Sequence, residues 1–336
     1  MGRNERRPTL KTIAAMTGLG VTTVSRALKD APDIGERTKA RVREAARSVG
    51  YRPDRAGVRL RTGRTQVVSL VLSTELDALG LSSFLVHGLA SSLAGTAFHL
   101  VVTPFSRGED PMRPVRYVVE SGAADGIVFA DTEPEDARAA YLLDAGFPFA
   151  AHGRTDFADR HAWFDFDNRA FARGAVERLA ALGCRRLAFV APPAHLAYGR
   201  HAREGWREGI ERAAVREVAF GPLTLDDPHE RLLARARALL GARRPVDGFV
   251  CSGARAALAV VAAGDALGLV AGEHYRVVAK ESHGIIARMF PGVIAVQEDY
   301  MRAGTVLGAQ LTALIGGADP AALHELDVPE FPDAGL

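Results

Sequence analysis

Residues 9–29 read TLKTIAAMTGLGVTTVSRALK, and this stretch decides how the chain is organised. Thr9, a residue type favoured at helix N-caps, precedes apolar residues at helical spacing: Leu10, Ile13 and Ala14. Gly18 to Gly20 interrupt the pattern, and a second apolar stripe follows at Val21, Val24 and Leu28. Two short helices joined by a three-residue turn with glycine indicate a helix-turn-helix. A third helix is expected from about Glu36 to Val49, before Gly50-Tyr51-Arg52-Pro53.

The charge of the chain is unevenly divided. Residues 1–65 contain 16 Lys and Arg against 6 Asp and Glu, a net charge of +10, whereas the rest carries −8. Binding of a basic segment to a polyanion is favourable because it releases condensed counterions. A solubilising tail or a plain helical bundle is the alternative interpretation, but the charge and the helix-turn-helix pattern agree on DNA.

The second helix of a helix-turn-helix enters the major groove, so its polar side chains are the candidates for reading bases. Arg26 has the geometry to bond guanine O6 and N7, Thr22 and Ser25 can bond base edges, and Val and Thr methyls can contact thymine. Thr9, Thr23 and Lys29 suit phosphates. The expected DNA contacts of this head are therefore Thr9, Val21, Thr22, Thr23, Ser25, Arg26 and Lys29.

The same stretch carries a specific resemblance. Residues 9–65, with the TVSRAL core, the GYRP sequence and the RTGRT exit, resemble the head of the lactose-repressor (LacI/GalR) family of bacterial transcription regulators. The order of segments that follows resembles that family over essentially the whole chain. The resemblance implies a repressor that binds a pseudo-palindromic duplex operator as a homodimer, with the first-lobe helices and the returning helix at the dimer seam.

Residues 54–61, DRAGVRLR, stand where the family has a hinge helix that folds on DNA and inserts a leucine into the minor groove. Leu60 occupies the place of that leucine, and Arg55, Arg59 and Arg61 flank it, which suits an apolar wedge with phosphate neutralisation. Gly57 departs from the alanine usual there and disfavours the helix, so we expect a hinge that is disordered off DNA. An exposed leucine in a basic linker is the alternative.

From Gln66 onward apolar strands alternate with helical patterns, which predicts parallel sheets flanked by helices. Strands are expected at 67–72, 98–102, 126–130, 147–151, 186–190, 217–220, 247–251 and 276–278. Helices are expected at 82–94, 111–121, 134–145, 168–182, 200–213, 229–240, 254–267 and 299–315. Two such series predict two lobes, because one sheet of this length would be unusual.

The fold class expected is an N-terminal all-α helix-turn-helix head followed by an α/β, periplasmic-binding-protein-like core of two doubly wound parallel-sheet lobes. The head spans 1–53, the hinge 54–65 and the core 66–336, with lobe 1 at about 66–166 and 299–323, and lobe 2 at about 167–296 and 325–331. The resemblance implies three crossings between the lobes, which we place near 167–168, 296–299 and 325–327, with the last strand in the second lobe.

Ligands of open α/β sheets bind beyond the carboxyl ends of the strands, so polar residues there are effector candidates. They are Ser73, Asp131, His152, Arg154, Arg203, Lys280, Glu281 and Tyr300. The resemblance gives Glu281 the place of an acid that bonds sugar hydroxyls and Tyr300 that of an aromatic that packs on the ligand. The family's usual arginine is Ala202 here, and its Ser/Asn-Asp pair is Gly253-Ala254. Each candidate could instead be a solvated loop residue, and the effector could be a sugar or a phosphorylated ligand.

The sequence favours a regulator over an enzyme. It has no dinucleotide-binding loop, P-loop, nucleophile elbow or metalloprotease motif, so we expect no catalytic residue, cofactor or metal. Two cysteines, no secretory signal and no long apolar run indicate a cytoplasmic protein away from membranes. The alternative is a sugar-metabolising enzyme or solute-binding protein of the same α/β class that carries a DNA-binding head.

Overall fold

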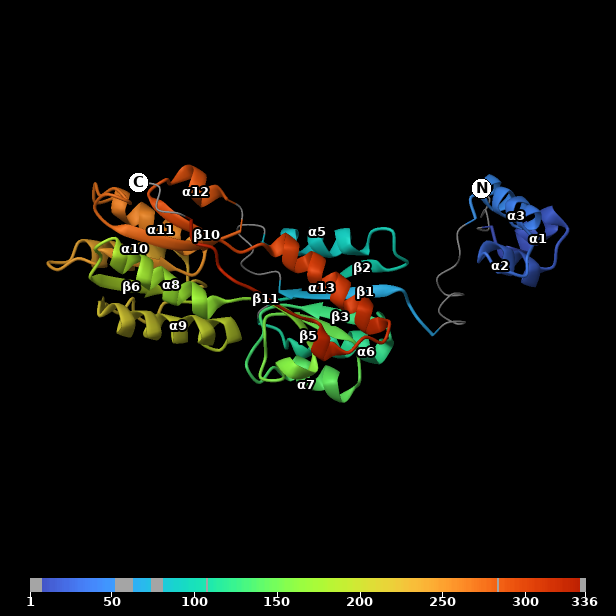
Figure 1. Cartoon of the computed structure of the whole chain (residues 1–336), viewed down its shortest axis with the longest axis horizontal. Coiled ribbons are helices and arrows are strands. Elements are labelled where there is room, and N and C mark those ends of the chain that lie inside the picture. The colour runs from blue at the N-terminus through green and yellow to red at the C-terminus, as the bar shows by residue number, and fades with distance from the viewer. Residues whose placement is uncertain (1–7, 52–62, 74–80, 107, 283, 333–336) are drawn as a thin grey trace. The chain divides into compact units, whose positions relative to one another are not determined.

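The computed structural model describes residues 8–51, 63–73, 81–106, 108–282 and 284–332. The chain forms two compact units, Met1–Thr65 and Gln66–Leu336, which are taken separately below (Figure 1). Residues 54–62 of the predicted hinge, including Arg55, Gly57 and Leu60, lie outside the described residues. Among the described helices, none combines the length and the apolar character that crossing a membrane requires.

The head contains the three predicted helices, α1 (Leu10–Thr17), α2 (Val21–Leu28) and α3 (Glu36–Ser48). Thr9 caps α1 by accepting a hydrogen bond from the Thr12 amide, and Gly18 ends the helix in the left-handed conformation, at φ 62°. Glycine adopts that conformation without steric cost. One apolar stripe from each helix forms the core of the head: Ile13, Val24, Ala27, Val42 and Ala46.

The first lobe is built on a parallel six-stranded sheet in the order β11-β5-β4-β3-β1-β2. Its strands are β1 (Val67–Ser73), β2 (His99–Phe105), β3 (Gly126–Phe129), β4 (Phe149–His152), β5 (Ala162–Phe166) and β11 (His324–Asp327). Its helices are α5 (Leu81–Leu93), α6 (Met112–Ser121), α7 (Ala137–Asp144) and α13 (Tyr300–Ile315), with short 3-10 turns at Ala158–Arg160 and Pro320–Ala322. Helices α5 and α13 cover one face of the sheet, and α6 and α7 cover the other (Figure 1).

Helices α5 and α13 pack in direct backbone contact. A Cβ added at Gly88 would lie 2.1 Å from the Met301 carbonyl oxygen, and one at Gly304 would lie 2.3 Å from the Leu85 carbonyl oxygen. Only glycine permits so close an approach. The inner faces of both helices are therefore used within the chain, and these faces are not available for the dimer seam expected from the sequence.

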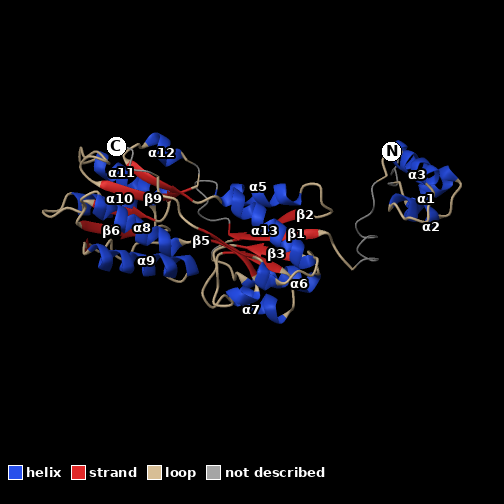
Figure 2. Cartoon of the chain, in the orientation of Figure 1, coloured by secondary structure: helices blue, strands red, loops and turns tan. Residues whose placement is uncertain are grey.

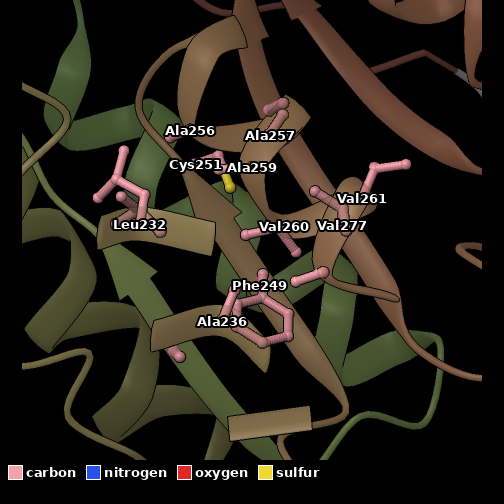
Figure 3. Packing of buried hydrophobic residues seen from close by; sticks show 14 of the residues in the cluster. Leu232, Ala236, Phe249, Cys251, Ala256, Ala257, Ala259, Val260, Val261 and Val277 are labelled. Carbon is pink, nitrogen blue, oxygen red and sulfur yellow. The ribbon is translucent and has the colours of Figure 1, made fainter. Parts of the chain in front are cut away.

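The second lobe has a parallel five-stranded sheet in the order β10-β9-β8-β6-β7 (Figure 2). Its strands are β6 (Arg186–Val190), β7 (Arg216–Glu217), β8 (Gly248–Cys251), β9 (Arg276–Glu281) and β10 (Val293–Gln297). Helices α8 (Asn168–Ala181) and α9 (Ala197–Ala213) pack on one face, and α10 (His229–Leu240), α11 (Ala254–Asp265) and α12 (Ile285–Met289) pack on the other. Figure 3 shows the hydrophobic core between the second sheet and helices α10 and α11, where Phe249 and Cys251 of β8 lie near Leu232 of α10 and Val260 of α11.

The predicted alternation of strands and helices is confirmed, but one strand was assigned to the wrong lobe. The last strand, β11, pairs with β5 in the first sheet, with His324 opposite Trp163 and Asp327 opposite Phe166. The chain reaches the second lobe only afterwards, where the Phe331 ring stacks on Phe171 at 6.3 Å. Strands β5 and β10 and helix α12 were not predicted, and β7 is shorter than expected.

Candidate DNA-binding surface and ligand cleft

Helix α2 divides its residues between the core of the head and its surface. Val24 and Ala27 are fully buried. Four of the predicted DNA contacts on or next to α2 are exposed: Val21, Thr22, Arg26 and Lys29. Thr23 and Ser25 are partly buried. Packing against the core therefore fixes the helix and leaves a continuous polar face with one exposed valine, which is what reading base edges requires.

Arg26 forms an ion pair with Asp33, at 2.5 Å between Nη2 and Oδ1, and both side chains are about half exposed. Ion pairs in water contribute roughly 0–1 kcal/mol, so Arg26 can exchange this carboxylate for guanine at little cost. The Thr9 hydroxyl, in contrast, is engaged in a reciprocal capping box with Thr12. A phosphate contact by Thr9 would compete with that cap.

Lys39 links the end of α2 to the start of α3. Its nearly buried Nζ lies 3.1 Å from Asp30 Oδ1 and donates to Glu36 Oε1 at 2.8 Å. Hydrogen bonding and attraction from Lys39, with a further contribution from Arg43, hold the pKa of Asp30 below its ordinary value. These contacts stabilise the geometry of the helix-turn-helix rather than offering a group to DNA.

In the core unit, a cleft opens at the carboxyl ends of strands from both lobes. This is the place where open α/β sheets bind ligands. The cleft is lined by Asp131, His152, Gly153, Asp165, Asn168, Tyr198, Leu225, Ser252, Gly253, Ala254, Lys280, Glu281, Ser282, Glu298 and Tyr300.

Lys280 is at the centre of the second-lobe side. Its Nζ lies 2.7 Å from Glu298 Oε2 and donates to Asn168 Oδ1 at 2.9 Å, and all three side chains are nearly buried. The ammonium also lies 5.1 Å from the centre of the Phe166 ring and 5.5 Å from that of Tyr198. The charge of Lys280 is thus already compensated by the protein.

On the first-lobe side of the cleft, Asp165 forms an ion pair with Arg154. Its Oδ2 accepts a hydrogen bond from Arg154 Nε at 2.7 Å, and His201 Nδ1 lies 3.9 Å away. Burial raises the pKa of Asp165 to about 6, because desolvation outweighs the attraction of Arg154. Arg154 itself does not line the cleft, and its guanidinium lies over the Trp163 ring at 5.6 Å.

His152 and Tyr300 form an aromatic wall, with ring centres 4.9 Å apart. Burial lowers the pKa of His152, so its imidazole is neutral at neutral pH. Within the part of the chain that the structure describes, His152 Nε2 and Ser252 Oγ are buried and have no hydrogen-bond partner. Buried polar groups are normally paired, so both atoms are candidates for a ligand's hydroxyl groups.

Five of the eight predicted effector residues line this one cleft: Asp131, His152, Lys280, Glu281 and Tyr300. Ser73 lines an adjoining chamber, and Arg154 reaches the cleft only through Asp165. Arg203 does not line the cleft, since it donates to the carbonyl oxygens of Gly199 and Pro192 within lobe 2.

Glu281 lines the cleft but is already engaged. Its carboxylate accepts the amides of Ile286 at 2.9 Å and Ala287 at 3.2 Å, and so caps α12. That it also bonds sugar hydroxyls stays a prediction, and the two amides limit how many further hydrogen bonds its carboxylate can accept.

Sequence reasoning missed six polar residues of the cleft: Asp165, Asn168, Tyr198, Ser252, Ser282 and Glu298. Asp165 lies in β5 and Glu298 follows β10, and neither strand was predicted. The runs AWFDF and VIAVQ that form these strands were the available signal. The described residues contain no group of three or more His, Cys, Asp or Glu side chains placed to hold a metal ion.

A helix-turn-helix unit and a two-lobed α/β core with a polar cleft define a class of proteins, the DNA-binding transcriptional regulators. Comparison with family models supports this class. Residues 9–54 match the bacterial regulatory proteins of the lacI family, and residues 176–331 match a periplasmic binding protein-like domain.

Two individual relatives support the same class of protein. CelR of Thermobifida fusca is 30% identical over 79% of this chain and 76% of its own length, and AglR of Rhizobium meliloti is 36% identical over 65% of this chain and 60% of its own length. Both are HTH-type transcriptional regulators. The chain therefore belongs to the LacI family, although its match spans only about 60% of the length of AglR.

Solved structures share the fold. The lac repressor dimer bound to operator and the anti-inducer ONPF has a TM-score of 0.83 at 19% identity, covering 97% of this chain and 98% of the repressor chain. A CelR–cellobiose complex has a TM-score of 0.68 at 24% identity, with the same coverage of both chains.

Proposed function

We propose that the protein binds a pseudo-palindromic DNA operator as a homodimer, represses transcription there, and changes its operator affinity when a neutral sugar occupies the cleft. The observation that carries the proposal is that one chain has both an exposed polar face on α2 and a polar, aromatic cleft in its core unit. A DNA-bound role of this kind also favours the cytoplasm as its location.

The charges of the cleft favour a neutral sugar over a sugar phosphate. Four acids line it, Asp131, Asp165, Glu281 and Glu298, whereas Lys280 is the one lining Lys or Arg among the described residues. Lys280 is paired with Glu298, so a phosphate would have to displace a buried carboxylate. Sugar hydroxyls need acceptors, donors and an apolar platform, which the acids, His152 and the tyrosines supply. The structure of a CelR with cellobiose fits the same class of ligand.

Contacts between the lobes of the core unit are what a ligand in the cleft can strengthen or weaken. The Ala197 amide of α9 donates to the Thr132 carbonyl oxygen at 2.8 Å, and Arg200 Nη2 donates to Asp156 Oδ1 at 2.6 Å. A ligand bound to both lobes changes the stability of this closed arrangement. Coupling between two sites is typically about 1–3 kcal/mol, enough to change operator affinity roughly 5- to 150-fold.

Strand β2 supports the homodimer. It is an edge strand of the first sheet, and its Val101 and Val102 are exposed by 46% and 42%. Exposed apolar residues on a strand edge favour pairing with another chain. A two-fold dimer would place two α2 helices on the half-sites of a palindrome, which one helix-turn-helix is too small to specify alone.

The test is fluorescence anisotropy with the full-length protein and fragments of the promoters next to its own gene. We expect salt-sensitive binding to one fragment, with an affinity that neutral sugars change and that sugar phosphates leave unaltered. Leu60→Ala, in the predicted hinge, should weaken this binding without affecting sugar binding. Absence of salt-sensitive binding to any promoter fragment would refute the proposal.

A further inference from the structure

The ligand cleft adjoins a second chamber that is lined mainly by first-lobe residues. Asp131 lines both spaces. On the second-lobe side two successive residues divide between them, since Leu225 lines the cleft and Asp226 lines the chamber. A ligand confined to the cleft would therefore leave an adjoining polar space unused.

The junction between the two spaces is a tight turn at Asp131. Its backbone has a positive φ of 53°, a conformation that few residue types other than glycine, asparagine and aspartate adopt. Arg138 supports this turn, because its guanidinium donates to the carbonyl oxygens of Ala130 at 3.2 Å and Asp131 at 2.8 Å. Asp136 holds Arg138 in turn, at 2.6 Å, with both side chains nearly buried.

This arrangement fixes the charge of the chamber. Arg138 is fully engaged by Asp136 and by the two carbonyl oxygens, so it is a positioning residue rather than an anion-binding one. The other acids of the chamber are Glu109, Asp131, Glu133 and Asp226. An anionic ligand would meet net negative charge, whereas carboxylates readily accept hydrogen bonds from hydroxyl groups.

The wall of the chamber also has an apolar part. Phe105, at the end of β2, lines it together with Pro111 and Met112, which lie at the start of α6. An aromatic ring next to hydroxyl-binding carboxylates suits the mixed surface of a sugar ring, which has apolar C–H faces and a polar rim.

We propose that the chamber is a second sugar subsite, and that the effector is a neutral oligosaccharide of at least two rings, with one ring in the cleft, the next in the chamber and Asp131 bonding both. The inference rests on the proposed function, since it assumes that the cleft binds a neutral sugar. It adds that Phe105, Asp131 and Glu133 determine the length of the ligand.

The test is isothermal titration of the full-length protein with cellobiose, maltose, melibiose and raffinose, and with glucose and galactose. We expect at least one oligosaccharide to bind tenfold or more tightly than either monosaccharide. Phe105→Ala and Glu133→Ala should each reduce that preference at least threefold and leave monosaccharide binding unaltered. Glu135→Ala is the matched control, because Glu135 is exposed two residues away and lines neither space.

The outcomes separate the two proposals. If a monosaccharide binds as tightly as every oligosaccharide, or if Glu133→Ala and Glu135→Ala behave alike, the second subsite is refuted while the proposed function stands. If none of the six sugars binds, the proposed function loses its neutral sugar and the subsite fails with it. Because Phe105 packs partly against the core, the exposed Glu133 provides the variant whose folding is not in question.

Discussion

The ion pair of Arg26 in the head and that of Lys280 in the cleft lie in opposite surroundings. In the head, Arg26 and Asp33 are exposed by 55% and 46%, and water competes for both charges. In the cleft, Lys280 and Glu298 are exposed by 8% and 5%, and neither has an alternative partner in solvent. The same chemistry therefore gives an exchangeable contact in one unit and a fixed element of structure in the other.

The acids of the two units respond to these surroundings in opposite directions. Lys39 and Arg43 lower the pKa of the exposed Asp30 in the head, whereas burial raises the pKa of Asp165 in the cleft in spite of Arg154. In the head, the carboxylate stays hydrated and the attraction of the cations sets the direction of the shift. In the cleft, loss of hydration outweighs the attraction of one cation.

Breaking the Lys280–Glu298 ion pair of the cleft should have the largest effect on the unfolding free energy. Glu298→Gln leaves the Lys280 ammonium buried without a counter-charge, which typically costs about 3–5 kcal/mol of unfolding free energy. Urea denaturation measures this. The double variant Lys280→Met with Glu298→Leu should be more stable than Glu298→Gln, since it removes both charges. A stability of Glu298→Gln within 1 kcal/mol of wild type would mean that the pair is not fixed.

Asp165 gives a pH dependence of predictable sign. With a folded pKa of about 6 against the ordinary 3.8, the folded protein binds its proton more tightly than the unfolded chain does. The contribution of Asp165 to the unfolding free energy is therefore greatest below about pH 4, falls as the pH rises to about 6, and stays low above it. At about 1.4 kcal/mol per pKa unit, the change is on the order of 2–3 kcal/mol.

Asp165→Asn should remove this dependence, so the stability of wild type relative to the variant should fall between pH 4 and pH 6. Urea denaturation of both proteins at half-unit steps measures the difference. A constant difference across this range would show that the Arg154 charge compensates the burial of Asp165.

Arg26→Ala tests the exchangeable side of the comparison. Loss of a bidentate contact with guanine should cost about 1–3 kcal/mol of operator binding and relax the preference at one base pair. The unfolding free energy should scarcely change, because the side chain is exposed. Arg47→Ala removes the same charge from an exposed site on α3 and is the control. An unchanged base preference in Arg26→Ala would exclude Arg26 from base reading.

The head could be predicted from the sequence almost residue by residue, and the cleft only in part, for a physical reason. The contacts of the head are local: Thr9 caps its own helix, and Val24 packs on helices within about 20 residues. The cleft joins Asn168, Lys280 and Glu298, which are more than 100 residues apart at the extremes. Periodicity placed Lys280 at a strand end, but only the fold shows that Glu298 compensates its charge.

The lobe of the last strand, β11, was predicted wrongly for a related reason. HELDV carries no periodicity that distinguishes one sheet from the other, and its place beside β5 is set by backbone pairing along the edge of the first sheet. Neither a propensity nor a charge in the sequence identifies that partner.

Asp33→Asn should have the smallest effect and would sharpen the comparison most. Because the pair is exposed, its loss should cost less than about 1 kcal/mol of unfolding free energy. Asp33 nevertheless restricts the orientation of the Arg26 guanidinium through this ion pair. Without Asp33, Arg26 can adopt more orientations and can therefore hydrogen-bond to more than one kind of base. Operator selection from a randomised half-site should therefore show a broader preference at the base pair read by Arg26, with a less than fivefold change in affinity for the best site.

Glu44→Gln is the matched control, because Glu44 is an exposed acid of the same head that pairs with Arg47 and not with Arg26. Both variants remove one negative charge and should raise non-specific DNA binding equally. Only Asp33→Asn should alter the base preference. If both variants select the same half-site as wild type, Asp33 has no part in orienting Arg26, and the head's ion pairs are exchangeable without consequence for specificity.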